Sequence, residues 1–130
     1  GVEGLIIPGN EKASVIPSSA ARMAEGGLEE VPVFTSSDLP SALRDCRKQG
    51  WFVVGADPSA KETLFNAKVK FPAVVVMGNE QEGLSSRVKQ KCDMVVRVPG
   101  KGLLQSLNVS VAAGVILAEI DRRRQTFKKN

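Results

Sequence analysis

The feature that most constrains the fold is a short apolar run that stops at a glycine-bounded acidic loop. Residues Ala73–Met77 read AVVVM, and residues 78–83 read GNEQEG. An unbroken apolar run of this length is typical of a strand buried on both faces. A second apolar strand, residues 94–98, is followed by a loop and a helix start at residues 106–108. Two such units predict an α/β domain with a mainly parallel sheet and helices on both faces.

Glycine and proline residues, together with helix-capping residues, mark the bounds of the other expected strands and helices. Further strands are expected at three short apolar runs, residues 4–8, 31–34 and 51–56. Helices are expected after Ser or Asp caps at residues 17–24, 37–47 and 85–92, with a stop at Gly50, while residues 63–70 are ambiguous. From Val109, apolar residues at offsets of three and four predict the longest helix, up to Ile120. One domain over residues 1–130 is expected, with a basic tail at 121–130.

The composition excludes several classes of protein. The chain has 130 residues, a hydrophobic fraction of 42% and a charged fraction of 25%, which is typical of a soluble domain with one core. Its apolar runs are far shorter than the ~18 residues that cross a bilayer. We therefore expect a cytoplasmic protein without a membrane partner, with an organelle as the alternative. Only Cys46 and Cys92 are cysteines and histidine is absent, so neither a metal site nor a histidine-activated nucleophile is expected.

The net charge of +4 is concentrated at the C-terminus. Residues 121–130 hold five cations and one acid, so the preceding 120 residues are neutral. A basic tail attracts phosphates. Cations are also the ordinary ending of a solvated helix, because they complement its dipole. The sequence leaves both interpretations open.

The two loops each allow a structural and a functional interpretation. GNEQEG lacks the Gly-Lys-Ser/Thr ending of a P-loop, and its acids Glu80 and Glu82 favour a cationic ligand such as the sulfonium of S-adenosylmethionine. Alternatively, it is an acidic surface turn in which Glu82 caps the next helix. Ser106 and Asn108 both suit an N-cap, and the side chain not used as a cap is free for a ligand or catalytic partner.

Together the two segments resemble the second and third motifs of the SpoU (TrmH-type) RNA ribose 2′-O-methyltransferases of the SPOUT superfamily. In that family Gly-x-Glu-x-x-Gly ends a strand, and a Pro-containing loop leads to Ser-Leu-Asn-Val-Ser at the start of the last helix, as at residues 78–83 and 106–110 here. The similarity runs almost end to end. The family's first motif, Asn-x-Gly-x-x-x-Arg, is missing, so the chain is expected to be a family domain trimmed at its N-terminus. No arginine here takes the place of the catalytic one.

The resemblance implies a deep C-terminal trefoil knot, S-adenosylmethionine as cofactor, rRNA or tRNA as substrate, and a homodimer. It also implies that Glu80, Ser106 and Asn108 are the catalytic positions, which orient the catalytic arginine and the target nucleotide. The cofactor pocket would be lined by four further residues, Gly55, Gly78, Val98 and Leu107.

Two other functions stay open at this point. The first is a non-catalytic RNA-binding module that keeps the SPOUT fold, because the arginine motif is missing. The second is an α/β enzyme for anionic small molecules, which explains each loop separately. The methyltransferase hypothesis requires the Glu80 turn and the helix entry at Ser106–Asn108 to lie side by side.

Overall fold

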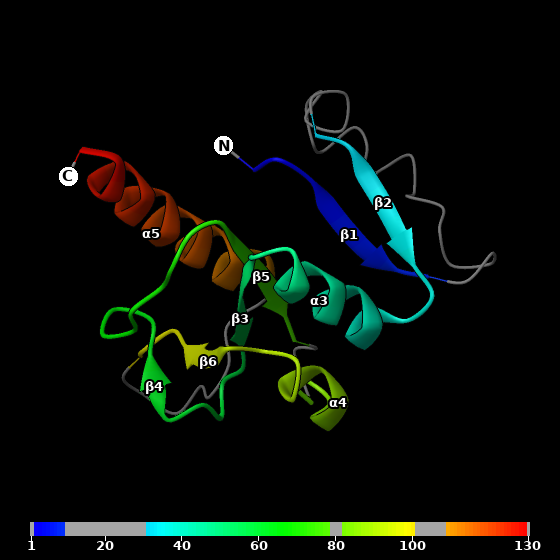
Figure 1. Cartoon of the computed structure of the whole chain (residues 1–130). Helices are drawn as coiled ribbons and strands as arrows, with labels where there is room; N and C mark the ends of the chain where they lie inside the picture. Colours follow the sequence, from blue (N-terminus) through cyan, green and yellow to red (C-terminus); the bar gives the residue numbers. More distant parts are fainter. Residues whose placement is uncertain (1, 10–30, 79–81, 101–108, 130) are drawn as a thin grey trace. The chain divides into compact units, whose positions relative to one another are not determined.

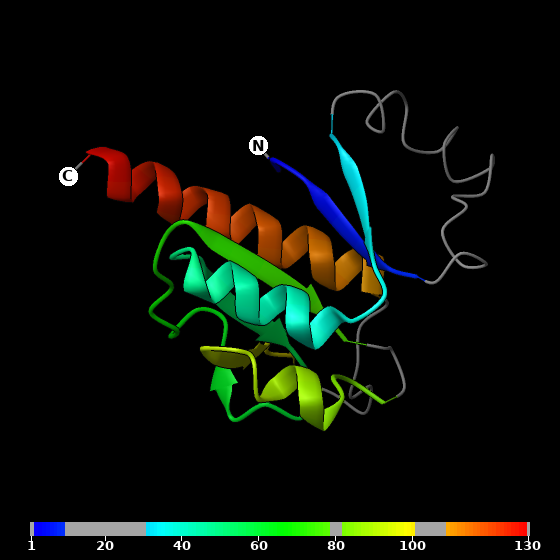
Figure 2. The same ribbon diagram turned by 45° about the vertical axis from the view of Figure 1, so that its right-hand side comes forward.

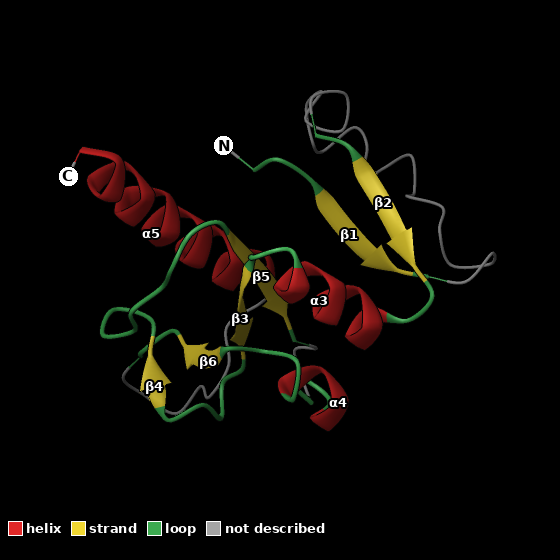
Figure 3. Cartoon of the chain, viewed as in Figure 1, coloured by secondary structure: helices red, strands yellow, loops and turns green. Residues whose placement is uncertain are grey.

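The computed structural model describes residues 2–9, 31–78, 82–100 and 109–129. The chain divides into two compact units, Gly1–Ala42 and Leu43–Asn130, which we describe separately. Figure 1 follows the chain in order, and Figure 3 separates its helices from its strands. The strands described are β1 (Leu5–Pro8), β2 (Val33–Ser36), β3 (Phe52–Ala56), β4 (Glu62–Thr63), β5 (Ala73–Met77) and β6 (Met94–Arg97). The helices described are α3 (Leu39–Lys48), α4 (Ser86–Lys89) and α5 (Val109–Lys129).

The first unit contains a parallel pair of strands. β1 pairs with β2 in a register that places Leu5 opposite Val33. Asp38 then caps α3, because its carboxylate accepts the backbone N–H of Ser41 at 3.3 Å and the Ser41 hydroxyl at 2.8 Å. The strand expected at residues 4–8 and the expected cap are therefore confirmed in this unit, and the strand expected at residues 31–34 lies two residues later. The last turns of α3 belong to the second unit.

The second unit is built on a parallel sheet with the strand order β4-β6-β3-β5. Each pair of neighbours in this sheet is parallel, and β3 pairs with β5 over five residues, from Phe52 opposite Ala73 to Ala56 opposite Met77. The three apolar runs that predicted strands here are correct to within one residue. Of the ambiguous segment, residues 63–70, only Thr63 belongs to a strand, the two-residue β4. The expected mainly parallel α/β sheet is confirmed.

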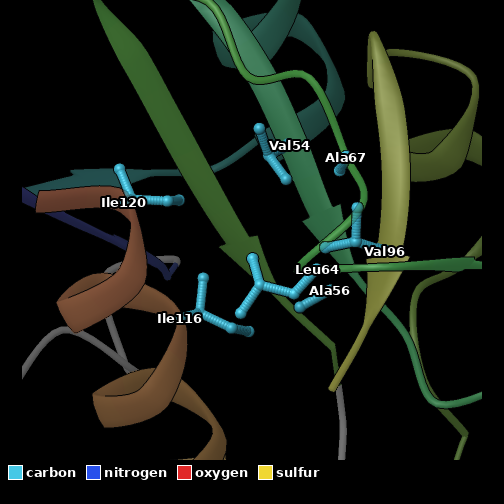
Figure 4. Packing of buried hydrophobic residues seen from close by; sticks show 7 residues of the cluster. All are labelled: Val54, Ala56, Leu64, Ala67, Val96, Ile116 and Ile120. Carbon is cyan, nitrogen blue, oxygen red and sulfur yellow. The ribbon is translucent and has the colours of Figure 1, made fainter. Parts of the chain in front are cut away.

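The core lies between this sheet and α5. Val54, Ala56 and Val96 of the strands form a buried cluster with Ile116 and Ile120 of α5. Figure 4 shows the two isoleucine side chains directed from the helix toward the strands. Each such side chain contributes about 1.5–3 kcal/mol when fully buried. This burial, rather than helix propensity, holds α5 on the sheet.

The opposite face of the sheet is also covered. Val53 points away from the α5 side, because successive strand residues alternate, and it is fully buried. Leu43 in the last turns of α3 is buried as well. Figure 2 shows these turns in front of β3 and β5, with α5 behind them. Helices on both faces of the sheet therefore agree with the prediction.

Several local expectations need correction. The helix expected at residues 85–92 is shorter, and its N-cap is Ser85 rather than Glu82, since the Ser85 hydroxyl accepts the Val88 N–H at 3.3 Å. Leu117, assigned to the buried stripe of the last helix, is 39% exposed. Cys46, expected in the core, is only half-buried. The helix expected at residues 17–24 lies outside the described residues.

The direction of α5 positions the site. The Phe127 ring lies 6.0 Å from the ring of Phe71, which precedes β5, so the end of the helix lies at the amino end of the sheet. Figures 1 and 2 both show α5 running antiparallel to β5. The 18 residues between Val109 and Phe127 span about 27 Å at 1.5 Å per residue, more than a five-residue strand. The first turn of α5 therefore lies at or beyond the carboxyl end of the sheet.

Candidate functional site

The carboxyl end of the sheet has a topological switch point at β3. After β3 the chain forms β4 at the sheet edge beyond β6. It then forms β5 on the opposite side of β3, and finally β6 between β4 and β3. In open α/β sheets, ligands bind outside the carboxyl ends of the strands at such a point. Gly78 and Val98, two predicted cofactor residues, closely follow the ends of β5 and β6. Two strand spacings separate those ends by roughly 10 Å.

Gly78 and Gly83 bring the two ends of the acidic loop together. A Cβ atom on Gly78 would lie 2.7 Å from the carbonyl carbon of Gly83 and 2.9 Å from the nitrogen of Leu84. Both neighbours are backbone atoms, which cannot rotate away as a flexible side chain could. Gly83 also has φ of +69°, a conformation that favours glycine. Both glycines of the GNEQEG sequence are therefore required by the backbone geometry.

Asp57, the first residue after β3, fixes the returning end of this loop. Its side chain is only 4% exposed. Its Oδ2 atom accepts the backbone N–H of Leu84 at 3.0 Å and lies 3.3 Å from Nζ of Lys89. Its Oδ1 atom accepts the N–H of Ser59 at 2.8 Å and the Ser59 hydroxyl at 2.7 Å. The carboxylate therefore ties the end of β3 to the loop and to α4.

These contacts keep Asp57 ionised. Burial by itself would raise the pKa of this carboxyl, but the hydrogen bonds from Ser59, Leu84 and Lys89 outweigh it and lower the pKa to about 2. Asp57 starts the turn Asp57-Pro58-Ser59 and is not among the site residues predicted from the sequence. An aspartate two residues before a serine, directly after a buried strand, is the local signal for such a turn. The contact with Leu84, 27 residues away, has no local signal.

Gly55 has a packing explanation in addition to its predicted role. A Cβ atom there would lie 2.6 Å from Cδ1 of Leu84 and 2.8 Å from Sγ of Cys92. Glycine therefore lets the loop and the segment after α4 approach β3. Burial, assisted by the neighbouring Asp93, raises the pKa of the Cys92 thiol to about 11, so this cysteine is protonated at neutral pH. Gly55 as a cofactor residue stays a prediction.

The remaining predicted site residues are only partly covered by the structure. Val98 is half-buried and packs against the core cluster. The other four, Glu80, Ser106, Leu107 and Asn108, lie outside the described residues. Within the described part of the chain, the loop ends at Gly78 and Gly83 and the first turn of α5 are at the same end of the sheet. The proximity of the Glu80 turn to the helix entry remains a prediction.

Comparison with known proteins identifies the family. The model of the SpoU rRNA methylase family matches residues 1–118. The chain belongs to this family. It is 35% identical over 130 residues to the 23S rRNA (guanosine-2′-O-)-methyltransferase RlmB of Neisseria meningitidis, covering all of this chain and 51% of the relative. The YacO protein of Bacillus subtilis, provisionally named a TrmH-family tRNA/rRNA methyltransferase, is 36% identical over 95% of this chain and 49% of its own length. The chain thus spans about half the length of these curated relatives.

A solved structure of a SpoU family member supports the same assignment. The SpoU methyltransferase AviRb of Streptomyces viridochromogenes, solved in complex with the cofactor AdoMet, superposes with a TM-score of 0.81 at 30% identity. The match covers 95% of this chain and 48% of AviRb. Together with the parallel sheet, it confirms the expected α/β fold class of the SpoU family. The knot stays a prediction. No helix of the described residues is long and apolar enough to cross a membrane.

Proposed function

We propose that this chain is the S-adenosylmethionine-binding, methyl-transferring domain of an RNA ribose 2′-O-methyltransferase that acts on rRNA or tRNA in the cytoplasm. The observation that carries the proposal is the close backbone contact between Gly78 and Gly83, the two ends of the acidic loop. Asp57 holds this contact at the switch point of the sheet. The relatives support it, because RlmB is named for guanosine 2′-O-methylation of 23S rRNA and AviRb was solved with AdoMet.

The described residues fit this cofactor. When bound, S-adenosylmethionine would supply a methyl group on a positively charged sulfur. Gly78 and Val98 lie on either side of the end of β3, with the first turn of α5 at the same end of the sheet. The exposed Glu82 makes the acidic loop compatible with a cation. We propose that Gly55, Gly78, Val98 and Leu107 hold the cofactor, largely through backbone groups.

The polar residues of the two motifs are assigned positioning roles. A ribose 2′-hydroxyl is a weak nucleophile, so its orientation toward the methyl group is a large part of catalysis. We propose that Glu80, Ser106 and Asn108 orient the target nucleotide and a catalytic arginine. None of the three is proposed as the general base.

We further propose the family's trefoil knot and a homodimer. On α5, Val111 is 54% exposed, and a Cβ atom on Gly114 would meet nothing within 4 Å. Close packing against the chain's own backbone therefore does not explain Gly114 among the described residues. A helix from a second copy would cover Val111 and Leu117 and make use of the small residue between them. Sedimentation equilibrium tests this: a dimer is expected, and a monomer at all concentrations would contradict it.

The function is tested with the full-length protein, by transfer of labelled methyl groups from S-adenosylmethionine to rRNA and tRNA. Glu80→Ala is expected to keep cofactor binding within about 3-fold and to lower transfer by about 100-fold, consistent with the removal of one positioning interaction. Glu62→Ala, at an exposed glutamate of β4, is the matched control and should retain full transfer. Undiminished transfer by Glu80→Ala would remove Glu80 from the site. A protein that binds RNA and cofactor without any transfer would favour the non-catalytic module.

A further inference from the structure

The amino end of the sheet carries a second candidate site, distant from the switch point. It is a pocket of about 520 Å³ around the starts of β3, β5 and β6, which we call the basic pocket. All of its residues belong to the second unit. Its cationic side chains are Arg44, Arg47, Lys48, Lys70 and Lys91. Asp93 is the one acid among the residues that line it.

The positive charge of the basic pocket is only partly compensated. Asp93 lies 3.1 Å from Nη2 of Arg47, and its other oxygen accepts the backbone N–H of Val53 at 2.8 Å. Within the described ranges, the structure pairs none of Lys48, Lys70 and Lys91 with an acid. Three lysines around one concave surface produce a local field that attracts anions.

Aromatic side chains lie among these cations. Trp51, Phe52 and Phe71 line the basic pocket and are half-buried. Phe71 also packs against Phe127, which is 66% exposed. Cations beside accessible aromatic rings are the combination that binds single-stranded nucleic acid, in which phosphates contact the cations and bases stack on the rings.

The basic tail is a weaker candidate for the same role. Arg122 and Arg123 bond to Glu119 at 2.8 and 2.9 Å, and Arg124 bonds to Asp121 at 2.7 Å. Arg123 also donates to the backbone carbonyls of three residues in the segment after β4, Leu64, Phe65 and Ala67. Three of the five tail cations therefore stabilise the chain's own structure, and the tail forms the end of α5.

We propose that the basic pocket binds single-stranded RNA, with phosphates on its lysines and a base against its aromatic side chains. The choice of RNA over other polyanions rests on the proposed function. A five-residue strand separates the two ends of the sheet by roughly 17 Å. The basic pocket therefore holds nucleotides remote from the ribose to be methylated and fixes the position of the RNA on the domain.

The first test measures binding of a fluorescein-labelled single-stranded RNA of about 20 nucleotides by fluorescence anisotropy. The double variant Lys48→Glu/Lys70→Glu is expected to bind about 10-fold more weakly or worse. The slope of log affinity against log salt should fall by about 1.4, or about 0.7 for each phosphate that the protein no longer neutralises. Lys61→Glu/Lys68→Glu is the matched control, because it makes the same charge change at exposed lysines outside the basic pocket. Equal weakening in both double variants would overturn the proposal.

Trp51 gives a second, local readout because it is the only tryptophan of the chain. The RNA is expected to quench its fluorescence in the unaltered protein, and to quench it much less in Lys48→Glu/Lys70→Glu. Quenching by a polyglutamate peptide at the same concentrations would overturn the assignment to RNA and indicate an acidic protein partner.

Cofactor binding separates this proposal from the proposed function. S-adenosylmethionine titrated in a calorimeter should bind both double variants as it binds the unaltered protein, which also shows that they are folded. If the unaltered protein binds no cofactor while its RNA binding still depends on Lys48 and Lys70, the proposed function fails and the basic pocket stands. If the cofactor binds normally and the Lys48→Glu/Lys70→Glu variant binds RNA as tightly as the unaltered protein, only the proposal for the basic pocket is wrong.

Discussion

The two ends of the central sheet differ in what makes them suitable for a ligand. At the carboxyl end, Gly78 and Gly83 have backbones in close contact, and Asp57 is buried with its hydrogen bonds made inside the protein. At the amino end, Lys48 and Lys70 are exposed and line an open pocket. The carboxyl end depends on backbone shape, so its residues cannot change without altering the fold locally. The amino end depends on charge, so its lysines can change with little effect on the fold.

This comparison predicts the largest effect at Asp57. Asp57→Ala leaves the Leu84 N–H and Lys89 without their buried partner, so the free energy of unfolding should fall by about 3 kcal/mol. Urea denaturation measures it. Asp45→Ala, at a carboxylate that is 63% exposed, should change the same quantity by less than about 0.5 kcal/mol. Similar losses in both variants would refute the anchoring role of Asp57.

A side chain at Gly78, where the two ends of the acidic loop meet, should have the next largest effect. Gly78→Ala places a methyl group against the backbone of Gly83, which we expect to weaken S-adenosylmethionine binding by about 30-fold, or about 2 kcal/mol. Calorimetric titration provides the measurement. Gly4→Ala is the matched glycine substitution, at a site where a Cβ makes only ordinary contacts, the nearest at 3.5 Å, and it should leave the cofactor affinity unchanged. Normal cofactor affinity in Gly78→Ala would place the cofactor elsewhere.

The free energy of unfolding should also depend on pH because of the buried carboxylate of Asp57. The pKa of Asp57 is lowered from 3.8 to about 2, so its stabilising effect is complete above about pH 5 and is lost as the pH falls through 2. The loss amounts to about 2 kcal/mol. Glu119, whose pKa is lowered to about 2 mainly by its hydrogen bond from Arg122, acts over the same range. Asp57→Asn should therefore make unfolding between pH 5 and pH 2 less pH-dependent without abolishing the dependence. An unchanged profile would contradict the assignment.

The smallest stability effect is expected at the amino end. Lys48→Ala should change the free energy of unfolding by less than about 0.5 kcal/mol, because the side chain is exposed. Its affinity for single-stranded RNA should nevertheless fall about 3-fold, because one phosphate is no longer neutralised. Denaturation and anisotropy on the same preparation compare the two quantities. If Lys48→Ala lowered the free energy of unfolding as much as Asp57→Ala, the two ends of the sheet would not differ in their contribution to stability, and the comparison would be wrong.

The sequence predicted the parts of the fold that have a local signal. Apolar runs bounded by glycine and proline located β3, β5 and β6, and the apolar periodicity located α5. The sequence predicts the acidic loop as a ligand site, with Gly78 as its cofactor glycine, but it gives no sign of the close backbone contact between Gly78 and Gly83. The resemblance of two loops, rather than either loop alone, led to the family.

The rest depended on contacts between residues far apart in the chain. Asp57 meets Leu84 across 27 residues, and no local pattern distinguishes it from an ordinary turn aspartate. The basic pocket gathers residues 44–52, 70–71 and 91–93, none of which is a basic cluster as pronounced as the tail. The tail is the most pronounced basic cluster in the sequence, yet its arginines pair with acids one helical turn earlier.

The most direct test of the account is a titration of the ¹⁵N-labelled protein with S-adenosylmethionine, followed through its backbone amide chemical shifts. The account predicts that the amides of Gly78, Gly83 and Val98, at the carboxyl end of the sheet, shift as the cofactor binds. It predicts no shift for Trp51 or Phe71 at the amino end. Shifts confined to Trp51 and Phe71, with Gly78 and Val98 unmoved, would contradict it.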